Sequence, residues 1–225
     1  MIVFHQNAFP SISMLLAAYF LLTSFFSLYL YFRINPTFSA SSKQQIYFSV
    51  MAIGQALYSY CAWKMFSTPF PEFFVVWQKI QWCAGAWIFW ASVMFSMEYL
   101  DLKIKWIQPL LFILGFIFAI FAISDQFHEM PMGIIVKLVD LWMLLILFPL
   151  LLVWFFYLTQ SRLQLRPVAL GMVFFILAEL NDKFVSLDYY QSPYVMEYGF
   201  FFFSLAFYYQ SSSIFINKNN NLRID

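Results

Sequence analysis

Five ionisable side chains stand near one end of three long apolar segments of the chain: Asp140, Glu179, Asp182, Lys183 and Glu197. Of these, Glu179, Asp182 and Lys183 are spaced i, i+3 and i+4, so they share one face of a helix. An ionisable group inside a transmembrane helix is costly to bury, and it usually faces the bundle interior, finds a partner and marks a functional path. The five residues are therefore candidate ligand contacts.

A fourth apolar segment adds aromatic and amide side chains at helical spacing. Trp77 and Gln81 are spaced i, i+4, and Gln78 and Trp82 form a second such pair. We expect one ligand pocket, mostly apolar with a few convergent polar groups, in which four residues of this segment join the five above: Trp77, Lys79, Gln81 and Trp82. Ion pairs that only hold helices together, and charges that reach water along their own side chains, are alternative explanations.

One further polar side chain stands near the middle of an apolar segment. Gln55 follows Gly54 in the segment over residues 46–66. A small residue beside an amide is typical of close helix packing with an interhelical hydrogen bond. We expect both features at this point.

The remaining reactive residues match none of the common catalytic or metal-binding motifs. The two histidines, His5 and His128, have no histidine or cysteine at ligand spacing on a helix. A serine–histidine pair, paired catalytic acids and a histidine-rich motif are also missing. We therefore expect no enzymatic activity in this chain, no cofactor and no metal ion. Cys61 and Cys83 are expected as small buried side chains, and the sequence leaves open whether they are bonded.

These residues must be positioned by long apolar helices. The chain of 225 residues is 63% hydrophobic and 10% charged. A helix needs about 20 apolar residues to cross a hydrocarbon core of about 30 Å. Seven such runs are read, at residues 10–32, 46–66, 73–97, 106–123, 133–158, 167–186 and 194–215. The pattern predicts an all-α membrane protein, a seven-transmembrane helix bundle.

The distribution of basic residues predicts the orientation of this bundle. If the first helix enters from outside, eight of the twelve lysines and arginines fall on the cytoplasmic side and four on the other. This bias places the N-terminus outside and the C-terminus in the cytoplasm. The candidate ligand contacts then lie in the outer third. We expect residues 1–216 to form one transmembrane domain and residues 217–225 a short cytoplasmic tail or a linker to an output domain.

Several motifs carry a resemblance to a known family. An aromatic-rich helix ends near Trp63, the run FVVWQKIQW covers residues 74–82, and FSMEYL at 95–100 precedes a short basic loop. This stretch resembles the bacterial seven-transmembrane sensor region found N-terminal to histidine kinases and diguanylate cyclases. EYGF at 197–200 and the segment 211–215 are similar to the last helix of related extracellular-sensing modules.

The resemblance implies a receptor of the bacterial inner membrane that takes part in signal transduction, as in two-component systems. Such a module detects an extracytoplasmic or membrane-borne ligand and transmits the signal through its last helix to a cytoplasmic signalling domain or partner protein. The acidic, aromatic site suits a small amphiphile, an amine or a lipid head group, and nucleic acid is not expected. A small-molecule transporter and a non-catalytic subunit of a membrane complex are the alternatives, and a homodimer is left open.

Overall fold

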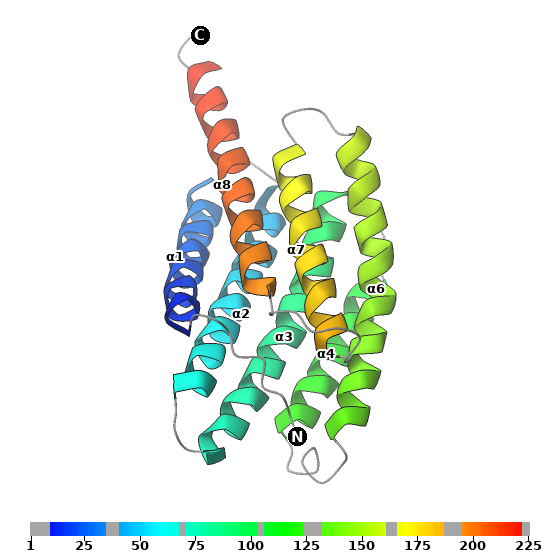
Figure 1. Ribbon diagram of the computed structural model, residues 1–225. Helices are drawn as coiled ribbons and strands as arrows, with labels where there is room; N and C mark the ends of the chain where they lie inside the picture. The colour runs from blue at the N-terminus through cyan, green and yellow to red at the C-terminus, as the bar shows by residue number, and fades with distance from the viewer. Residues whose placement is uncertain are drawn as a thin grey trace. The chain divides into compact units, whose positions relative to one another are not determined.

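The computed structural model describes seven segments of the chain: residues 10–34, 41–67, 71–102, 106–123, 132–160, 166–186 and 195–221. Each segment is built on one α-helix, and together these segments contain seven helices and no strand (Figure 1). The predicted all-α class is confirmed, and the described segments contain as many helices as the sequence predicts.

The helices are α1 (Pro10–Ile34), α2 (Ser41–Ser67), α3 (Pro71–Tyr99), α4 (Ile107–Ile123), α6 (Met132–Gln160), α7 (Arg166–Ser186) and α8 (Met196–Asn221). Most of these bounds lie close to the predicted ones, because polar residues or proline flank the apolar runs. The helix α2 begins earlier than predicted, and α8 ends later. In both places polar residues continue the helix beyond its apolar part, which an apolar pattern alone does not reveal.

Three helical segments in the described part of the chain are long and apolar enough to cross a membrane: Ile12–Phe32, Phe74–Tyr99 and Met143–Gln160. They indicate a membrane protein. The helix α4 has only 17 residues, which is short for a span, and α7 carries charges at both ends. A bundle with seven spans and the predicted orientation therefore remain predictions.

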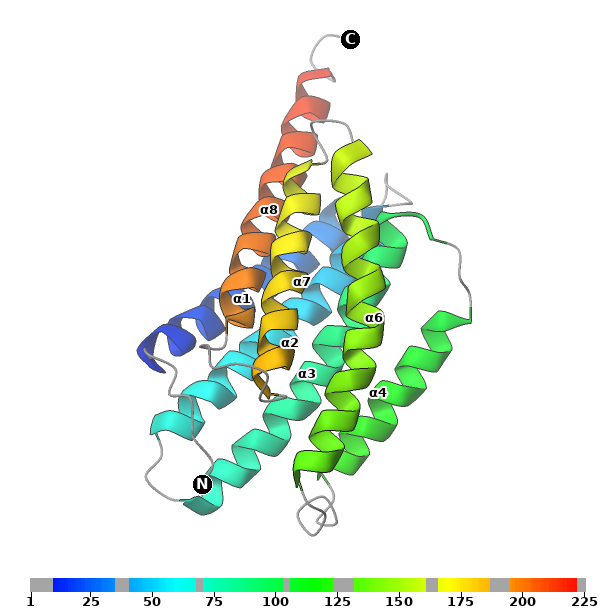
Figure 2. The same cartoon turned by 45° about the vertical axis from the view of Figure 1, so that its right-hand side comes forward.

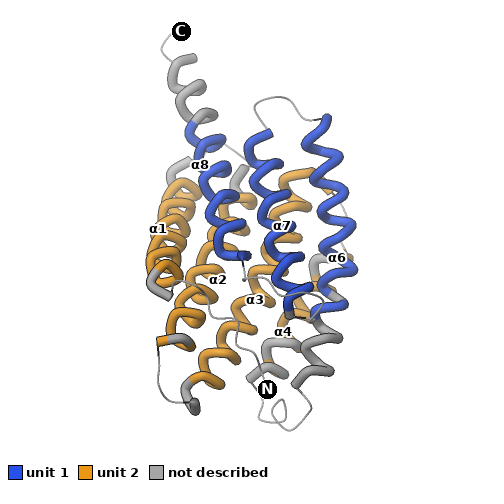
Figure 3. Tube along the Cα trace, viewed as in Figure 1, with its two compact units in different colours: residues 1–5, 133–225 blue, residues 6–132 orange. Residues whose placement is uncertain are grey.

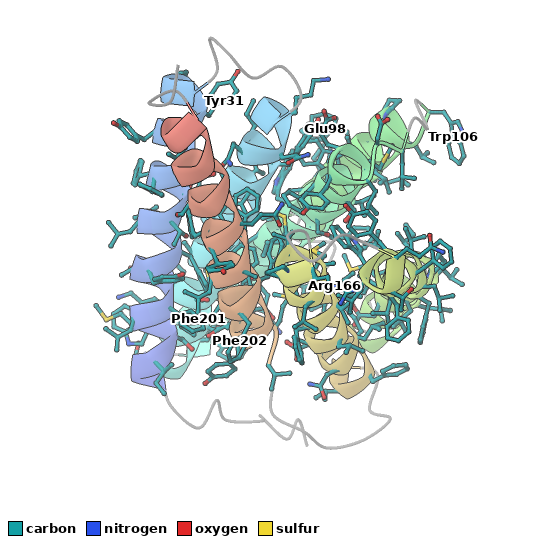
Figure 4. All side chains as sticks on the ribbon, turned by 90° about the horizontal axis from the view of Figure 1, so that it is seen from above. Tyr31, Glu98, Trp106, Arg166, Phe201 and Phe202 are labelled. Carbon is teal, nitrogen blue, oxygen red and sulfur yellow. The ribbon has the colours of Figure 1, made fainter. Side chains whose placement is uncertain are left out.

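Large apolar side chains are exposed on the outer faces of several helices. Phe32 on α1 and Leu152 on α6 are among the most exposed, and Trp106, just before α4, is 66% exposed. Figure 4 shows Trp106 pointing away from the ribbon. Soluble monomeric proteins seldom expose extensive apolar patches, whereas helices that face lipid do. This surface agrees with the membrane assignment.

The chain divides into two compact units (Figure 3): residues 6–132 form one, and residues 1–5 with 133–225 form the other. We call them the N-terminal unit, which contains α1 to α4, and the C-terminal unit, which contains α6 to α8.

In the N-terminal unit, α1 packs against α2 through small polar side chains. The Ser27 hydroxyl donates to the side-chain oxygen of Gln45 at 2.5 Å, and the Ser24 hydroxyl donates to the main-chain carbonyl of Ser49 at 3.2 Å. On the other side, a Cβ added at Gly54 of α2 would lie 2.8 Å from Cγ1 of Ile88 on α3. The close packing predicted at Gly54 is confirmed.

In the C-terminal unit, α7 and α8 form a tightly packed pair, which lie side by side in Figures 1 and 2. A Cβ added at Gly171 would lie 3.0 Å from the Cβ of Ala206, and one added at Gly199 would lie 2.5 Å from the Cβ of Ala178. Small residues seven positions apart on each helix therefore face each other. We call these four residues the small-residue contact.

Aromatic rings pack between α7 and α8 beside the small-residue contact. Phe175 on α7 and both Phe200 and Phe203 on α8 are fully buried, with ring centroids 5.4 to 6.1 Å apart. The helix α6 approaches α7 differently, through long side chains such as Phe148 and Phe184, whose ring centroids are 6.2 Å apart.

Candidate functional site

An ion pair joins α6 to α7 in the C-terminal unit. The Lys183 ammonium Nζ lies 2.9 Å from Oδ1 of Asp140, and the carboxylate side of this pair is the more buried. The pair crosses between helices that are neighbours in sequence and run in opposite directions. The expectation that charges of different helices meet is thus fulfilled for this pair.

Asp182 caps the N-terminus of α8. Its Oδ1 accepts hydrogen bonds from the main-chain N–H of Val195 at 2.7 Å and from the Asn181 side chain at 3.1 Å, while its Oδ2 accepts from the N–H of Met196 at 3.1 Å. The first N–H groups of a helix lack partners within the helix, and its N-terminus carries a partial positive charge. The Asp182 carboxylate accepts hydrogen bonds from these N–H groups and places a negative charge beside the positive end of the helix. It thereby fixes where α8 begins.

Glu179 stands one turn before Asp182 on the same face of α7. Its side chain is buried, with 2% of the residue exposed, and its Oε2 finds no hydrogen-bond partner. Glu179 interacts electrostatically with Lys183, Asp182 and Asp140. We call these four residues the acidic cluster, and Glu179 is its member with a carboxylate oxygen still available.

Glu197 is buried in the first turn of α8. A carboxylate in that position interacts favourably with the positive end of the helix dipole. This placement explains why the acid is tolerated there, and its predicted contact with a ligand stays a prediction.

The four predicted site residues on α3 belong to the N-terminal unit: Trp77, Lys79, Gln81 and Trp82. Gln81 is buried, while the other three are half-buried. The Trp77 ring meets the Tyr60 ring of α2 edge-on, with centroids 5.7 Å apart. These residues lie in a different unit from the acidic cluster, so a pocket that joins both groups stays a prediction.

Several buried polar residues of α1 and α2 were not singled out by the sequence pattern. Ser24, Ser27, Gln45 and Ser49 form the hydrogen-bonded contact between these helices. Their spacing, three residues apart on α1 and four on α2, is the signal that would have pointed to a polar helix face. Serines are common enough in membrane helices that this signal alone is weak.

Gln55 behaves differently from the prediction. Neither its Oε1 nor its Nε2 finds a hydrogen-bond partner, and the Ser59 hydroxyl one turn later is also unpaired. The predicted interhelical hydrogen bond of Gln55 is therefore not formed in the structure. Cys61, on the same helix, forms no disulfide with Cys83.

Comparison of the chain with protein-family models, with curated proteins and with solved structures finds no match. The fold and the site define a class only: an all-helical protein with three candidate membrane spans and a buried acidic cluster in its C-terminal unit. The resemblance to bacterial sensor regions stays a prediction.

Proposed function

We propose that this chain is a seven-helix receptor module of the bacterial inner membrane that binds a small ligand at the acidic cluster and transmits the signal through α8. The observation that supports this proposal most is the buried Glu179 carboxylate with its unpaired Oε2. In the proposed orientation, the cluster lies toward the outer side of the membrane and α8 leads to the cytoplasm. The role is one of detection rather than catalysis.

Ion pairs and hydrogen bonds that hold the helices together account for Asp140, Asp182 and Lys183 of the acidic cluster, but not for Glu179. Asp140 is engaged by Lys183, and Asp182 is engaged by the main chain at the start of α8. Glu179 has no comparable partner at Oε2. Because an unpaired polar group in a buried site costs free energy, such a group suggests an interaction that a ligand completes.

The contacts of Asp182 suggest how binding reaches the cytoplasmic side. Glu179 and Asp182 lie on one face of α7, and the Asp182 carboxylate holds the first N–H groups of α8. A ligand bound at Glu179 can favour one position of the Asp182 carboxylate. Because that carboxylate binds the first N–H groups of α8, the ligand then also favours one position of α8. The small-residue contact brings α7 and α8 close together, so a shift at the end of α7 would be passed to α8.

A ligand screen on the chain in lipid nanodiscs tests this proposal. Amphiphiles, amines and soluble lipid head groups would be titrated while the thermal unfolding of the protein is followed. A compound that raises the unfolding temperature of the wild type, but not of a Glu179→Gln variant, supports a ligand site at the cluster. Absence of any such compound, or purification of the chain at fixed stoichiometry with another membrane protein, would favour the subunit alternative.

The transporter alternative is favoured by the same residue, because buried acids also serve in proton and ion pathways. Reconstitution into proteoliposomes separates the two functions. Uptake of a compound that binds at the cluster would identify a carrier, whereas binding without uptake fits the receptor. The output then passes to a cytoplasmic signalling domain or a partner protein.

A further inference from the structure

We infer that the ligand of the acidic cluster is an organic primary ammonium ion, R–NH3+, bound by Glu179. This inference rests on the proposed function and narrows its ligand class.

The charges of the cluster leave a deficit of positive charge. Three carboxylates face one ammonium group, so the formal charge of the four ionised residues is one minus three, or −2. Lys183 lies against Asp140, and the partial positive charge of the α8 N-terminus lies against Asp182. Glu179 is the carboxylate that remains without a cation in hydrogen-bond contact.

The available oxygen determines which cation fits. Oε2 of Glu179 is an unpaired acceptor, and an N–H donor of an ammonium group would satisfy it. Calcium needs six to eight oxygen ligands, and magnesium a nearly ideal octahedron. A quaternary ammonium ion carries charge but no N–H group. A primary ammonium ion therefore matches the site better than these alternatives.

The residues next to Glu179 along α7 are apolar and buried. Phe175, one turn before Glu179, is fully buried, and so is Ile176. The neighbouring Ala178 and Leu180 are also buried. A free alkylamine and the ethanolamine head group of a phospholipid both combine an ammonium group with an apolar part. They share the chemistry that the site recognises.

The test compares three ligands of equal chain length: hexylammonium, 1-hexanol and hexyltrimethylammonium. Each is titrated against the chain in phosphatidylcholine nanodiscs, and the dissociation constant is measured by saturable thermal stabilisation. We expect hexylammonium to bind most tightly. Glu179→Gln should weaken it at least about thirtyfold, since one partner of a buried charge pair is lost.

Glu98→Gln is the matched control, because Glu98 is a half-buried acid on α3 in the N-terminal unit. It should leave hexylammonium binding unchanged. If Glu179→Gln does not fold, Glu179→Asp keeps the charge and shortens the side chain. This variant should weaken hexylammonium binding while the preference over hexanol remains.

A second arm identifies the source of the ammonium group. In nanodiscs that contain phosphatidylethanolamine, native mass spectrometry should show this lipid retained by the wild type and lost from Glu179→Gln if the head group is the ligand. If neither form retains the lipid and hexylammonium binds equally in both kinds of nanodisc, a free amine is the ligand. Either result supports the ammonium class.

Equal binding of hexanol or hexyltrimethylammonium, or hexylammonium binding that Glu179→Gln does not weaken, would overturn the inference. If a neutral or anionic compound of the wider screen binds in a Glu179-dependent manner instead, the receptor proposal stands and only the ammonium class is wrong. If no compound and no lipid binds, both fail.

Discussion

Two glutamines on α2 are both buried but have different partners. Gln45 accepts a hydrogen bond from Ser27, whereas Gln55 has no partner for either polar atom. Replacing a hydrogen-bonded group leaves its partner unsatisfied, but replacing an unpaired buried amide removes a cost. We therefore predict that Gln45→Leu lowers the stability by about 1 kcal/mol and that Gln55→Leu leaves it unchanged or raises it.

The measurement is thermal unfolding of the two variants and the wild type in the same nanodiscs. The two substitutions are chemically identical on one helix, so each is the control for the other. A large loss of stability for Gln55→Leu would show that a partner such as a water molecule or a ligand satisfies this amide in the membrane.

The sequence shows that Gln45 follows Gln44 in the polar start of α2 and that Gln55 stands in its apolar middle, but it does not show which amide finds a partner. The difference depends on which residue of another helix stands opposite each amide. The same limit applies to the acids. The spacing of Glu179, Asp182 and Lys183 correctly predicts a shared face, but the role of Asp182 depends on where α8 begins in space.

At the scale of elements, the α7–α8 pair depends on the small-residue contact. A methyl group added at Gly199 would meet the Cβ of Ala178 at 2.5 Å, so one helix must shift. Overpacking of this kind costs about 1–3 kcal/mol. We predict that Gly199→Ala lowers the unfolding temperature. Gly85→Ala on α3 is the matched control, because nothing lies within 4 Å of its added Cβ.

Gly85→Ala should leave the stability unchanged or raise it by up to about 1 kcal/mol, since alanine is the better helix former. The prediction for Gly199 would be wrong if both alanine variants raised the unfolding temperature. In that case helix propensity, and not close packing, would determine the effect at both positions.

The start of α8 provides a second prediction for this pair. Asp182→Ala removes the acceptor of the Val195 and Met196 N–H groups, so these amides should exchange with solvent hydrogen faster. Loss of a helix cap costs about 0.5–2 kcal/mol. Hydrogen exchange followed by mass spectrometry on peptides that cover residues 193–204 measures the change. Asp182→Asn, which keeps one acceptor oxygen, should give an intermediate rate.

Peptides from the middle of α7 provide the internal reference, because their amides bond within the helix. Unchanged exchange at the start of α8 in Asp182→Ala would show that water or another group replaces the carboxylate. The Asp182 cap would then not couple the acidic cluster to α8.

The bounds of these elements could largely be predicted, but their partners could not. Apolar runs bounded by proline and polar residues located seven helices, because a helix buried in apolar surroundings needs a continuous apolar surface. The heptad spacing of Gly171 and Ala178 on α7, and of Gly199 and Ala206 on α8, is visible in the sequence. Which helices these residues bring together follows only from the structure.

At the scale of the whole molecule, the number of membrane crossings can be decided by reporter fusions. A chain with seven spans and one with only the three most apolar spans both begin outside and end inside. They differ at three connections: seven spans place residues 68–70 and 187–194 outside and residues 103–105 inside, whereas three spans reverse all of these. Fusions at these positions therefore discriminate, and a fusion after Asp225 does not.

We predict that alkaline phosphatase, which is active only outside the cytoplasm, is active when fused within 68–70 or 187–194. Green fluorescent protein should fluoresce when fused within 103–105. The physical reason is the excess of lysine and arginine on the side assigned to the cytoplasm, which includes Lys103 and Lys105. The reverse pattern would leave α2, α4, α7 and α8 outside the set of spans. Residues 187–194, which follow α7, would then lie inside while Asp140 stays near the outer end of α6, so the two parts of the acidic cluster could not form one site open to an extracytoplasmic ligand.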